Sequence, residues 1–417
     1  MLLDFESEQQ GGSEWCTTLT LRRMMMRRRR KKKKKKKQQP EEEEEEGCSS
    51  DDGEEKDVER KMDVVMERSK PLGEEEGENS RSGLRGRRRL YPRGRRRMYV
   101  YDEHDRTFWG DVSVILMLYF PFQVYPILVA VIVFQFPKIL LPIALVVALV
   151  SLGMPLVYLP WLWRRNFLAR PLALWHRRVR ILTPDEPMLP DRPLIFGVHP
   201  HGRVFVSFSI ILFLHRWWLV TRSATGGAPL LRRDSHVFFG VTDALMVVPI
   251  LRNIFGAIGL VSASRAVLRR ILDAGNHVAL LVGGVQEVCL GTSDDIDTLY
   301  LHPRKGFIKL AMESGAGVVP VYCFGENRLF KHTSKACLGF WRSVNRYLPV
   351  GAPFPVCGIA NMMLPFRGDL LIAFGDPLFP HEGESLDDFH ARYVCAIQAL
   401  FDTYVQHTEK PVALVIV

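Results

Sequence analysis

The chain has 417 residues, a formal net charge of +10 at pH 7 and seven cysteines, none of them in a CxxC pair. This cysteine spacing predicts neither a disulfide framework nor a structural zinc site. The excess of positive charge suits nucleic acid, anionic lipid or a polyanionic cofactor, and the position of the charge along the chain has to distinguish between these partners.

Residues 1–107 are dominated by charge and contain almost no apolar periodicity. Eleven consecutive cations, Arg27–Lys37, lie close to six consecutive anions, Glu41–Glu46. Like charges at every position repel one another and bury nothing, so this segment is predicted to be a disordered, solvated tail. Attraction to an anionic membrane or to RNA is the alternative interpretation. The first ten residues carry acids and no apolar stretch, so no secretory signal is expected there.

Two uncharged runs follow, at residues 112–136 and 139–163, with only Pro137 and Lys138 between them. Each is long enough to cross a hydrocarbon core about 30 Å thick. Arginines flank the pair on both sides, which places both flanks on the cytosolic side under the positive-inside rule. Residues 108–165 are therefore predicted to form a transmembrane or re-entrant helical hairpin. A buried helical pair in a soluble domain is the alternative.

Residues 166–417 change to short apolar runs separated by Gly and Pro, and are predicted to form a cytosolic-facing domain. Strand and helix patterns alternate there, which indicates an α/β fold with a mostly parallel sheet flanked by helices. The expected strands are 193–198, 236–241, 257–262, 277–284, 317–325 and 369–375. The expected helices are 204–218, 244–255, 264–275, 304–315 and 385–408.

The stretch FGVHPHG places His199 and His201 at the end of the first of these strands. No GxSxG, Cys–His, GxxxxGK[ST] or GxGxxG motif is present, so acyl-enzyme, P-loop and dinucleotide chemistries lack their key residues. Histidine acting as a general base on a substrate that brings its own nucleophile remains. Glu287, just past the strand at 277–284, is the expected orienting acid. A surface glutamate is the alternative.

Two further features bear on ligands. Arg304 and Lys305 open the helix predicted at 304–315, where a helix N-terminus already favours anions, so they are a candidate phosphate site. A solvated basic helix face is the alternative. No metal site is predicted, because the HPH pair has no third ligand at a suitable spacing.

The stretches HPHG (199–202), GGVQEV (283–288), RKGFIKLAMESGAGVVPVYCFGEN (304–327), YFP (119–121) and FGDPL (374–378) together resemble the type-2 diacylglycerol acyltransferases. The resemblance covers residues 110–408. It implies an endoplasmic-reticulum membrane enzyme that transfers an acyl chain from acyl-CoA to diacylglycerol, making triacylglycerol for lipid droplets. It also implies kinship with glycerolipid acyltransferases that pair a histidine with an aspartate. Arg203 and Val204 stand where that aspartate is expected, which makes Glu287 the preferred partner.

On this interpretation His201, or alternatively His199, takes the proton of the acceptor hydroxyl, which attacks the thioester. Main-chain N–H groups of Gly202, or of Gly283 and Gly284, are expected to stabilise the oxyanion. The CoA phosphates are assigned to basic residues that include the helix predicted at 264–275: Arg304, Lys305, Arg265, Arg269 and Arg270. Acyl-CoA is a substrate, and no cofactor or specific nucleic acid is expected.

Three alternatives stay open: a sister enzyme acting on monoacylglycerol or a long-chain (wax) alcohol, a non-enzymatic hairpin protein of lipid droplets, and an RNA-binding protein. A homo-oligomer is also left open.

Overall fold

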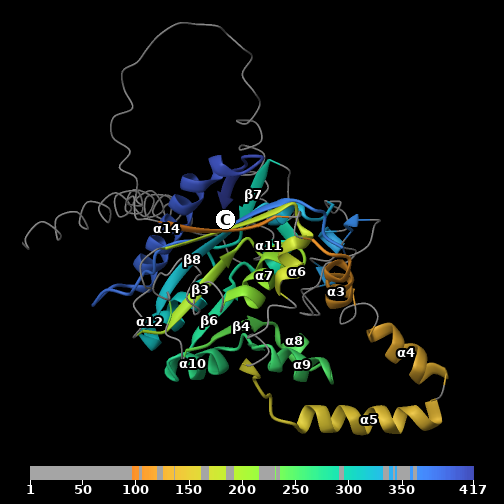
Figure 1. Ribbon diagram of the computed structural model, residues 1–417. Helices are drawn as coiled ribbons and strands as arrows, with labels where there is room; N and C mark the ends of the chain where they lie inside the picture. The colour runs from red at the N-terminus through yellow and green to blue at the C-terminus, as the bar shows by residue number, and fades with distance from the viewer. Residues whose placement is uncertain are drawn as a thin grey trace, which may run out of the picture. The chain divides into compact units, whose positions relative to one another are not determined.

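The centre of the molecule is an eight-stranded sheet (Figure 1). The computed structural model describes residues 96–102, 106–119, 125–135, 137–160, 169–184, 192–215, 231, 235–290, 295–331, 338–340, 343–344, 357–359 and 364–417. The apolar runs recognised in the sequence form most of the strands, because a continuous apolar segment of five to eight residues suits a strand that is buried on both faces.

The strands of the main sheet lie in the order β1-β2-β9-β8-β3-β6-β4-β5. They are β1 Arg96–Asp102, β2 Arg178–Pro184, β3 Leu194–His199, β4 Val237–Val241, β5 Leu260–Ser262, β6 His277–Leu281, β8 Gly317–Phe324 and β9 Asp369–Phe374. The β1–β2 and β8–β9 pairs are antiparallel and the other pairs are parallel. A separate parallel pair joins β7, Ile296–Leu299, to β10, Ala413–Ile416. The mixed, mostly parallel sheet confirms the predicted α/β class.

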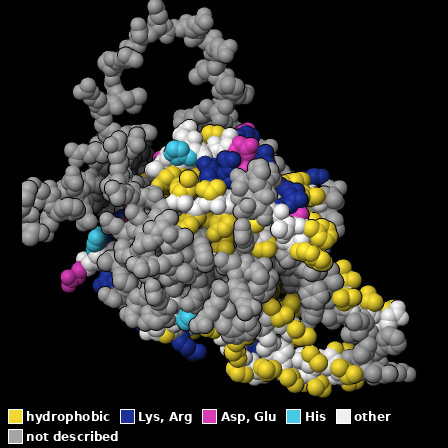
Figure 2. All heavy atoms as spheres, in the orientation of Figure 1, with side chains coloured by type: hydrophobic (Ala, Val, Ile, Leu, Met, Phe, Trp, Pro, Cys, Tyr) yellow, Lys and Arg dark blue, Asp and Glu magenta, His cyan; other side chains and the backbone are white. Residues whose placement is uncertain are grey.

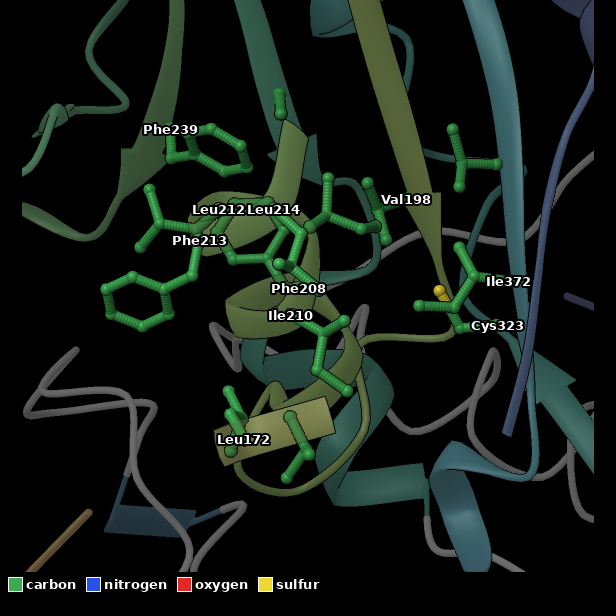
Figure 3. Packing of buried hydrophobic residues seen from close by; sticks show 14 of the residues in the cluster. Leu172, Val198, Phe208, Ile210, Leu212, Phe213, Leu214, Phe239, Cys323 and Ile372 are labelled. Carbon is green, nitrogen blue, oxygen red and sulfur yellow. The ribbon is translucent and has the colours of Figure 1, made fainter. Parts of the chain in front are cut away.

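Helices cover both faces of this sheet. They are α6 Ala169–Trp175, α7 Val206–His215, α8 Asp243–Met246, α9 Leu251–Ala257, α10 Arg265–Asp273, α11 Gly284–Leu290, α12 Gly306–Ser314, α14 Leu386–Tyr404 and the 3-10 turns η5 Glu326–Arg328 and η7 Val405–His407. One hydrophobic cluster packs α6, α7 and α9 against the strands, and a second packs α10, α12 and α14 against them. Figure 3 shows the first cluster, in which Phe208 and Phe213 of α7 lie beside Phe239 of β4.

The two long apolar runs differ from the predicted hairpin. They are divided among α3 Phe108–Tyr119, α4 Tyr125–Gln135 and α5 Pro137–Gly153. Among the described residues, none of the helices combines the length and apolar character needed to cross a membrane. Proline supplies the physical reason: Pro126 and Pro137 lie in the first turns of α4 and α5, where a missing N–H costs nothing and the fixed φ starts a helix.

The carboxyl end of α5 is attached to α9. Ser151 Oγ accepts the Ile250 N–H at 2.7 Å and donates to Asn253 Oδ1 at 2.5 Å, and the Arg252 guanidinium donates to the carbonyls of Ser151 and Met154. Away from this attachment the side chains of α5 are largely exposed: Leu145, Val146 and Leu149 are 58%, 59% and 61% exposed. Figure 2 shows hydrophobic side chains gathered along α4 and α5.

Several elements were not predicted. Residues 96–102, assigned to the charged tail, form β1, and β2, α6, α11, β7 and β10 had no sequence prediction. The predicted helix at 244–255 is two short helices, α8 and α9. The other tail residues and Trp217 and Trp218 lie outside the described residues.

Candidate active site

Three loops meet at the carboxyl edge of the neighbouring strands β8, β3 and β6. The strand β3 leads into residues 199–202, β6 into residues 283–284, and β8 into residues 325–326. Because these strands are parallel, their carboxyl ends lie at one edge of the sheet, which is where open α/β sheets place ligands. The HPHG and GGVQE stretches are thereby brought together.

His199 is the last residue of β3, and its side chain is fully buried. Its Nε2 lies 2.9 Å from the hydroxyl of Tyr393 on α14, and its Nδ1 has no hydrogen-bond partner within the described ranges. Burial lowers the pKa of His199 to about 3, so the ring is neutral at physiological pH. The His199 ring therefore packs in the interior below residues 200–202 and contacts α14.

His201 is only partly buried, and its ring is oriented by the turn itself. Its Nδ1 lies 2.9 Å from the Gly202 carbonyl oxygen. A carbonyl can only accept, so Nδ1 carries the proton and Nε2 presents a lone pair. Burial lowers the pKa of His201, the bond to Gly202 opposes this, and the charge of Arg304 lowers it further. A neutral imidazole with a free lone pair is the state that a general base requires.

Glu287 lies on α11 and reaches the histidine turn through the main chain. Its Oε1 accepts the His201 N–H at 2.5 Å, and its Oε2 accepts the Tyr300 N–H at 2.9 Å. A Cβ at Gly283 would lie 2.0 Å from this carboxylate, so only glycine fits there. Burial raises the pKa of Glu287 to about 7, against the two main-chain bonds that lower it. Glu287 and His201 are together, but the amide of His201 makes the contact and the imidazole bonds to Gly202.

Arg304 braces the glycine loop after β6. Its guanidinium donates to the Gly283 carbonyl at 3.0 Å and to Gln286 Oε1 at 3.1 Å, and it lies over the Tyr300 ring at 5.2 Å from the centroid. A Cβ at Gly284, where φ is +61°, would lie 3.3 Å from the Arg304 Nη2 atom. The cation therefore lies beside the candidate base and beside Glu287.

Three of the other four predicted phosphate ligands have carboxylate neighbours. Lys305, which precedes α12, is 2.6 Å from Asp387. On α10, Arg265 contacts Glu313, and Arg269 lies 3.2 Å from Asp273 and 3.7 Å from Glu313. Such exposed pairs are weak, since solvent screens them, and they leave the cations able to exchange partners. The remaining predicted ligand, Arg270, is in the last turn of the same helix.

Within the part of the chain that the structure describes, no group of three or more His, Cys, Asp or Glu side chains is arranged to hold a metal ion. The candidate site consists of two histidines, a buried glutamate and a neighbouring guanidinium.

The sequence profile of one family, diacylglycerol acyltransferase, matches residues 161–416, more than half of the chain. This chain belongs to the diacylglycerol acyltransferase family. The resemblance inferred from the motifs is thereby confirmed, and the protein is an acyltransferase whose family implies acyl-CoA and acylglycerol substrates.

Relatives of this acyltransferase carry three different acceptor names. Diacylglycerol O-acyltransferase 2 of Danio rerio is 27% identical over 269 residues, covering 58% of this chain and 70% of the relative. Acyl-CoA wax alcohol acyltransferase 1 of Homo sapiens is 28% identical, with 61% and 83% covered. The human 2-acylglycerol O-acyltransferase 3 is also 28% identical, with 61% and 81% covered. Among solved structures, the 1-acyl-sn-glycerophosphate (LPA) acyltransferase PlsC from Thermotoga maritima aligns with 70% of this chain and 97% of its own, at 14% identity and a TM-score of 0.35.

Two residues of the acyltransferase site had no sequence prediction. Tyr393 contacts His199 from a helix 194 positions away in the chain. Glu326, two residues after the end of β8, contacts α7. The FGEN stretch that contains Glu326 ends a buried strand at the same sheet edge as HPHG, and this position was the available signal. Nothing comparable marks Tyr393, which lies in the middle of an amphipathic helix.

Tyr393→Phe is expected to lower kcat by about fivefold, since one hydrogen bond is worth about 1 kcal/mol. The hydroxyl lies 2.9 Å from His199 Nε2 and 3.3 Å from the Gly197 carbonyl, and its loss frees the His199 ring to rotate beneath the turn. The ring remains packed against Phe307, but Nε2 of the buried His199 loses this partner, so the melting temperature should also fall. Tyr404→Phe on the same helix is the matched control. A kcat equal to that of the wild type would contradict the prediction.

Proposed function

We propose that this acyltransferase is an acyl-CoA:diacylglycerol O-acyltransferase that makes triacylglycerol by direct transfer, with His201 as the general base. The observation that carries the proposal is the hydrogen bond between His201 Nδ1 and the Gly202 carbonyl, which leaves Nε2 as a proton acceptor. Residue 201 is also the more exposed of the two histidines, so an acceptor hydroxyl can reach it.

In the proposed reaction, Nε2 of His201 accepts the proton of the acceptor hydroxyl while the hydroxyl oxygen attacks the thioester carbonyl carbon. The tetrahedral intermediate then expels CoA as a thiolate, which takes the proton back from the imidazolium. The Gly202 carbonyl stabilises the imidazolium through Nδ1–H during this cycle. No covalent acyl-enzyme forms, so the proton is the only group that the protein accepts from a substrate and returns during the reaction.

The oxyanion of the intermediate is assigned to main-chain N–H groups in the glycine turns, at Gly202 or at Gly283 and Gly284. Such donors each contribute about 3 to 4 kcal/mol when well placed. Arg304 supports this assignment because it holds the Gly283 carbonyl and so fixes the loop. The CoA phosphates are assigned to Arg304 and Lys305, together with Arg265, Arg269 and Arg270 of α10.

We also place this enzyme at the endoplasmic-reticulum membrane and lipid droplets, with its catalytic domain on the cytosolic side. The apolar side chains exposed along α4 and α5 support this placement, because soluble monomers rarely expose contiguous apolar surface of this kind. Both substrates partition into membranes, so an apolar surface near the catalytic domain shortens their path to it.

A monoacylglycerol or a long-chain alcohol is the second candidate acceptor, and the names of two human relatives favour keeping it. Microsomes containing the enzyme and labelled acyl-CoA, offered each acceptor in turn, test the choice. Triacylglycerol formed from diacylglycerol at the highest kcat/KM is the expected result. Wax ester as the main product would identify a long-chain alcohol as the acceptor, and diacylglycerol as the main product would identify monoacylglycerol. Hydrolysis of acyl-CoA with no acylated product would contradict acyl transfer.

A further inference from the structure

Glu326 is a buried carboxylate in the third loop at the site, and the proposed reaction assigns it no role. It opens η5 and follows Gly325, the one residue between β8 and η5, which has a φ of +90°. Glu326 is only 2% exposed. A carboxylate at this depth must be satisfied by several donors, because an uncompensated buried charge costs several kcal/mol.

Among the described residues, three hydrogen-bond donors to Glu326 belong to the start of α7. Oε1 accepts the Val206 N–H at 2.9 Å, and Oε2 accepts the Ser207 N–H at 2.8 Å and the Ser207 hydroxyl at 2.5 Å. The first N–H groups of a helix lack partners within the helix and carry its positive dipole end, so an anion binds there favourably. Glu326 therefore fixes the first turn of α7 from a segment 120 residues away.

The same carboxylate contacts the histidine turn. A Cβ built on Gly202 would lie 2.5 Å from Glu326 Oε1 and 2.6 Å from its Cγ, so the Gly202 main chain packs directly on this side chain. Gly202 is also the residue whose carbonyl oxygen orients the ring of His201. The chain from residue 202 to residue 207 is thus held by Glu326 at both ends.

The next residue, Asn327, contacts β7. Its Nδ2 donates to Asp297 Oδ1 at 2.8 Å, and the Tyr322 hydroxyl donates to Asp297 Oδ2 at 2.8 Å. Asp297 lies on β7, and that strand leads into Tyr300, whose N–H donates to Glu287. One short loop therefore supports the histidine turn through Glu326 and the Glu287 region through Asn327.

We propose that Glu326 is a positioning residue for acyl transfer, which holds the Gly202 carbonyl and the start of α7 so that the His201 ring keeps its catalytic orientation. This inference rests on the proposed role of His201. Glu326 touches neither the imidazole nor the reacting atoms; it acts through the main chain of the turn. An unsupported turn would let the Gly202 carbonyl move away from Nδ1, and the ring would then sample other orientations and tautomers.

Glu326→Gln tests the proposal. A carboxamide has one acceptor oxygen where the carboxylate has two, and its N–H groups face the donors of α7, so at least one of the three bonds is lost. We expect kcat to fall about tenfold per folded enzyme, while KM for acyl-CoA stays within about twofold, because orientation of the base matters in the transition state and less in the bound state. Glu326→Asp, which keeps the charge, should recover part of the loss.

Glu409→Gln is the matched control, since it makes the same change at a half-exposed glutamate that bridges Arg177 and should leave kcat unchanged. A purely structural role predicts a lower melting temperature with wild-type kcat per folded enzyme, and that outcome would overturn the proposal. If Glu326→Gln does not fold, Ser207→Ala tests the positioning role instead, because it removes one of the three hydrogen bonds to Glu326. A fall in kcat of about threefold supports the proposal, and an unchanged kcat overturns it.

The assays use the acceptor that the wild-type enzyme prefers. A wild type that transfers to no acceptor refutes the proposed function, whereas an active wild type with an equally active Glu326→Gln variant refutes the positioning role alone.

Discussion

His201→Ala is expected to lower kcat for acyl transfer by about 100-fold or more, the range in which positioned general bases act. Without Nε2, the acceptor hydroxyl must lose its proton to water, while the glycine turns and the CoA-binding residues stay in place. KM for acyl-CoA should therefore change little. The measurement is labelled triacylglycerol formed per folded enzyme, with thermal unfolding recorded in parallel.

His381→Ala serves as the control, because His381 lies in an exposed loop after β9. His199→Ala separates the two histidines: it removes a buried ring, and its loss of activity should be accompanied by a lower melting temperature. A His201→Ala enzyme that keeps more than half of the wild-type kcat would falsify the assignment of the base.

Glu287→Gln is expected to lower kcat by about tenfold or more, because each main-chain donor contacts a different carboxylate oxygen and the variant replaces one of these oxygens with an NH2 group, which cannot accept. It should also change how stability depends on pH. The pKa of Glu287 is raised from 4.5 to about 7 in the folded protein, so the native state binds more protons than the unfolded state between these values. The free energy of unfolding contributed by this residue therefore falls as pH rises from 4.5 to 7, by about 3 kcal/mol in total.

Glutamine does not titrate, so the variant lacks this slope. Denaturant unfolding of both proteins in detergent between pH 5 and pH 8 should show the wild type losing stability relative to Glu287→Gln as pH rises. Glu409→Gln should run parallel to the wild type. Curves for Glu287→Gln that also run parallel to the wild type would mean that Glu287 has an ordinary pKa.

The central sheet was predictable because its strands are short apolar runs ended by Gly or Pro, as in residues 193–198 and 277–284. The elements that escaped prediction lack that signal. The strand β7 has four residues and contains Asp297, whose charge is satisfied only by partners brought in by the fold. The strand β1 is rich in arginine, and its composition matched the charged segment before it.

At the site, the sequence indicated which residues meet but not which atoms. HPHG and GGVQE follow adjacent parallel strands, and this was enough to bring His201 and Glu287 together. The imidazole was nevertheless expected to pair with the carboxylate, and it bonds to a neighbouring carbonyl. For the apolar helices, the break at Pro137 was predicted, because the two uncharged runs meet there, and α5 begins at that residue. The division of the first run into α3 and α4 was not predicted, because the length of an uncharged run does not show that Pro126 lies in the first turn of a new helix.

The contact between Tyr393 and His199 also sets the order in which the site is completed during synthesis. These two residues are separated by 194 positions, so the histidine turn leaves the ribosome long before the helix that supports it. At about 5 to 20 residues per second, the delay is roughly 10 to 40 s. During that interval the nascent chain contains both histidines, but His199 lacks its contact with the Tyr393 hydroxyl. The histidine turn therefore gains this support only when α14 docks.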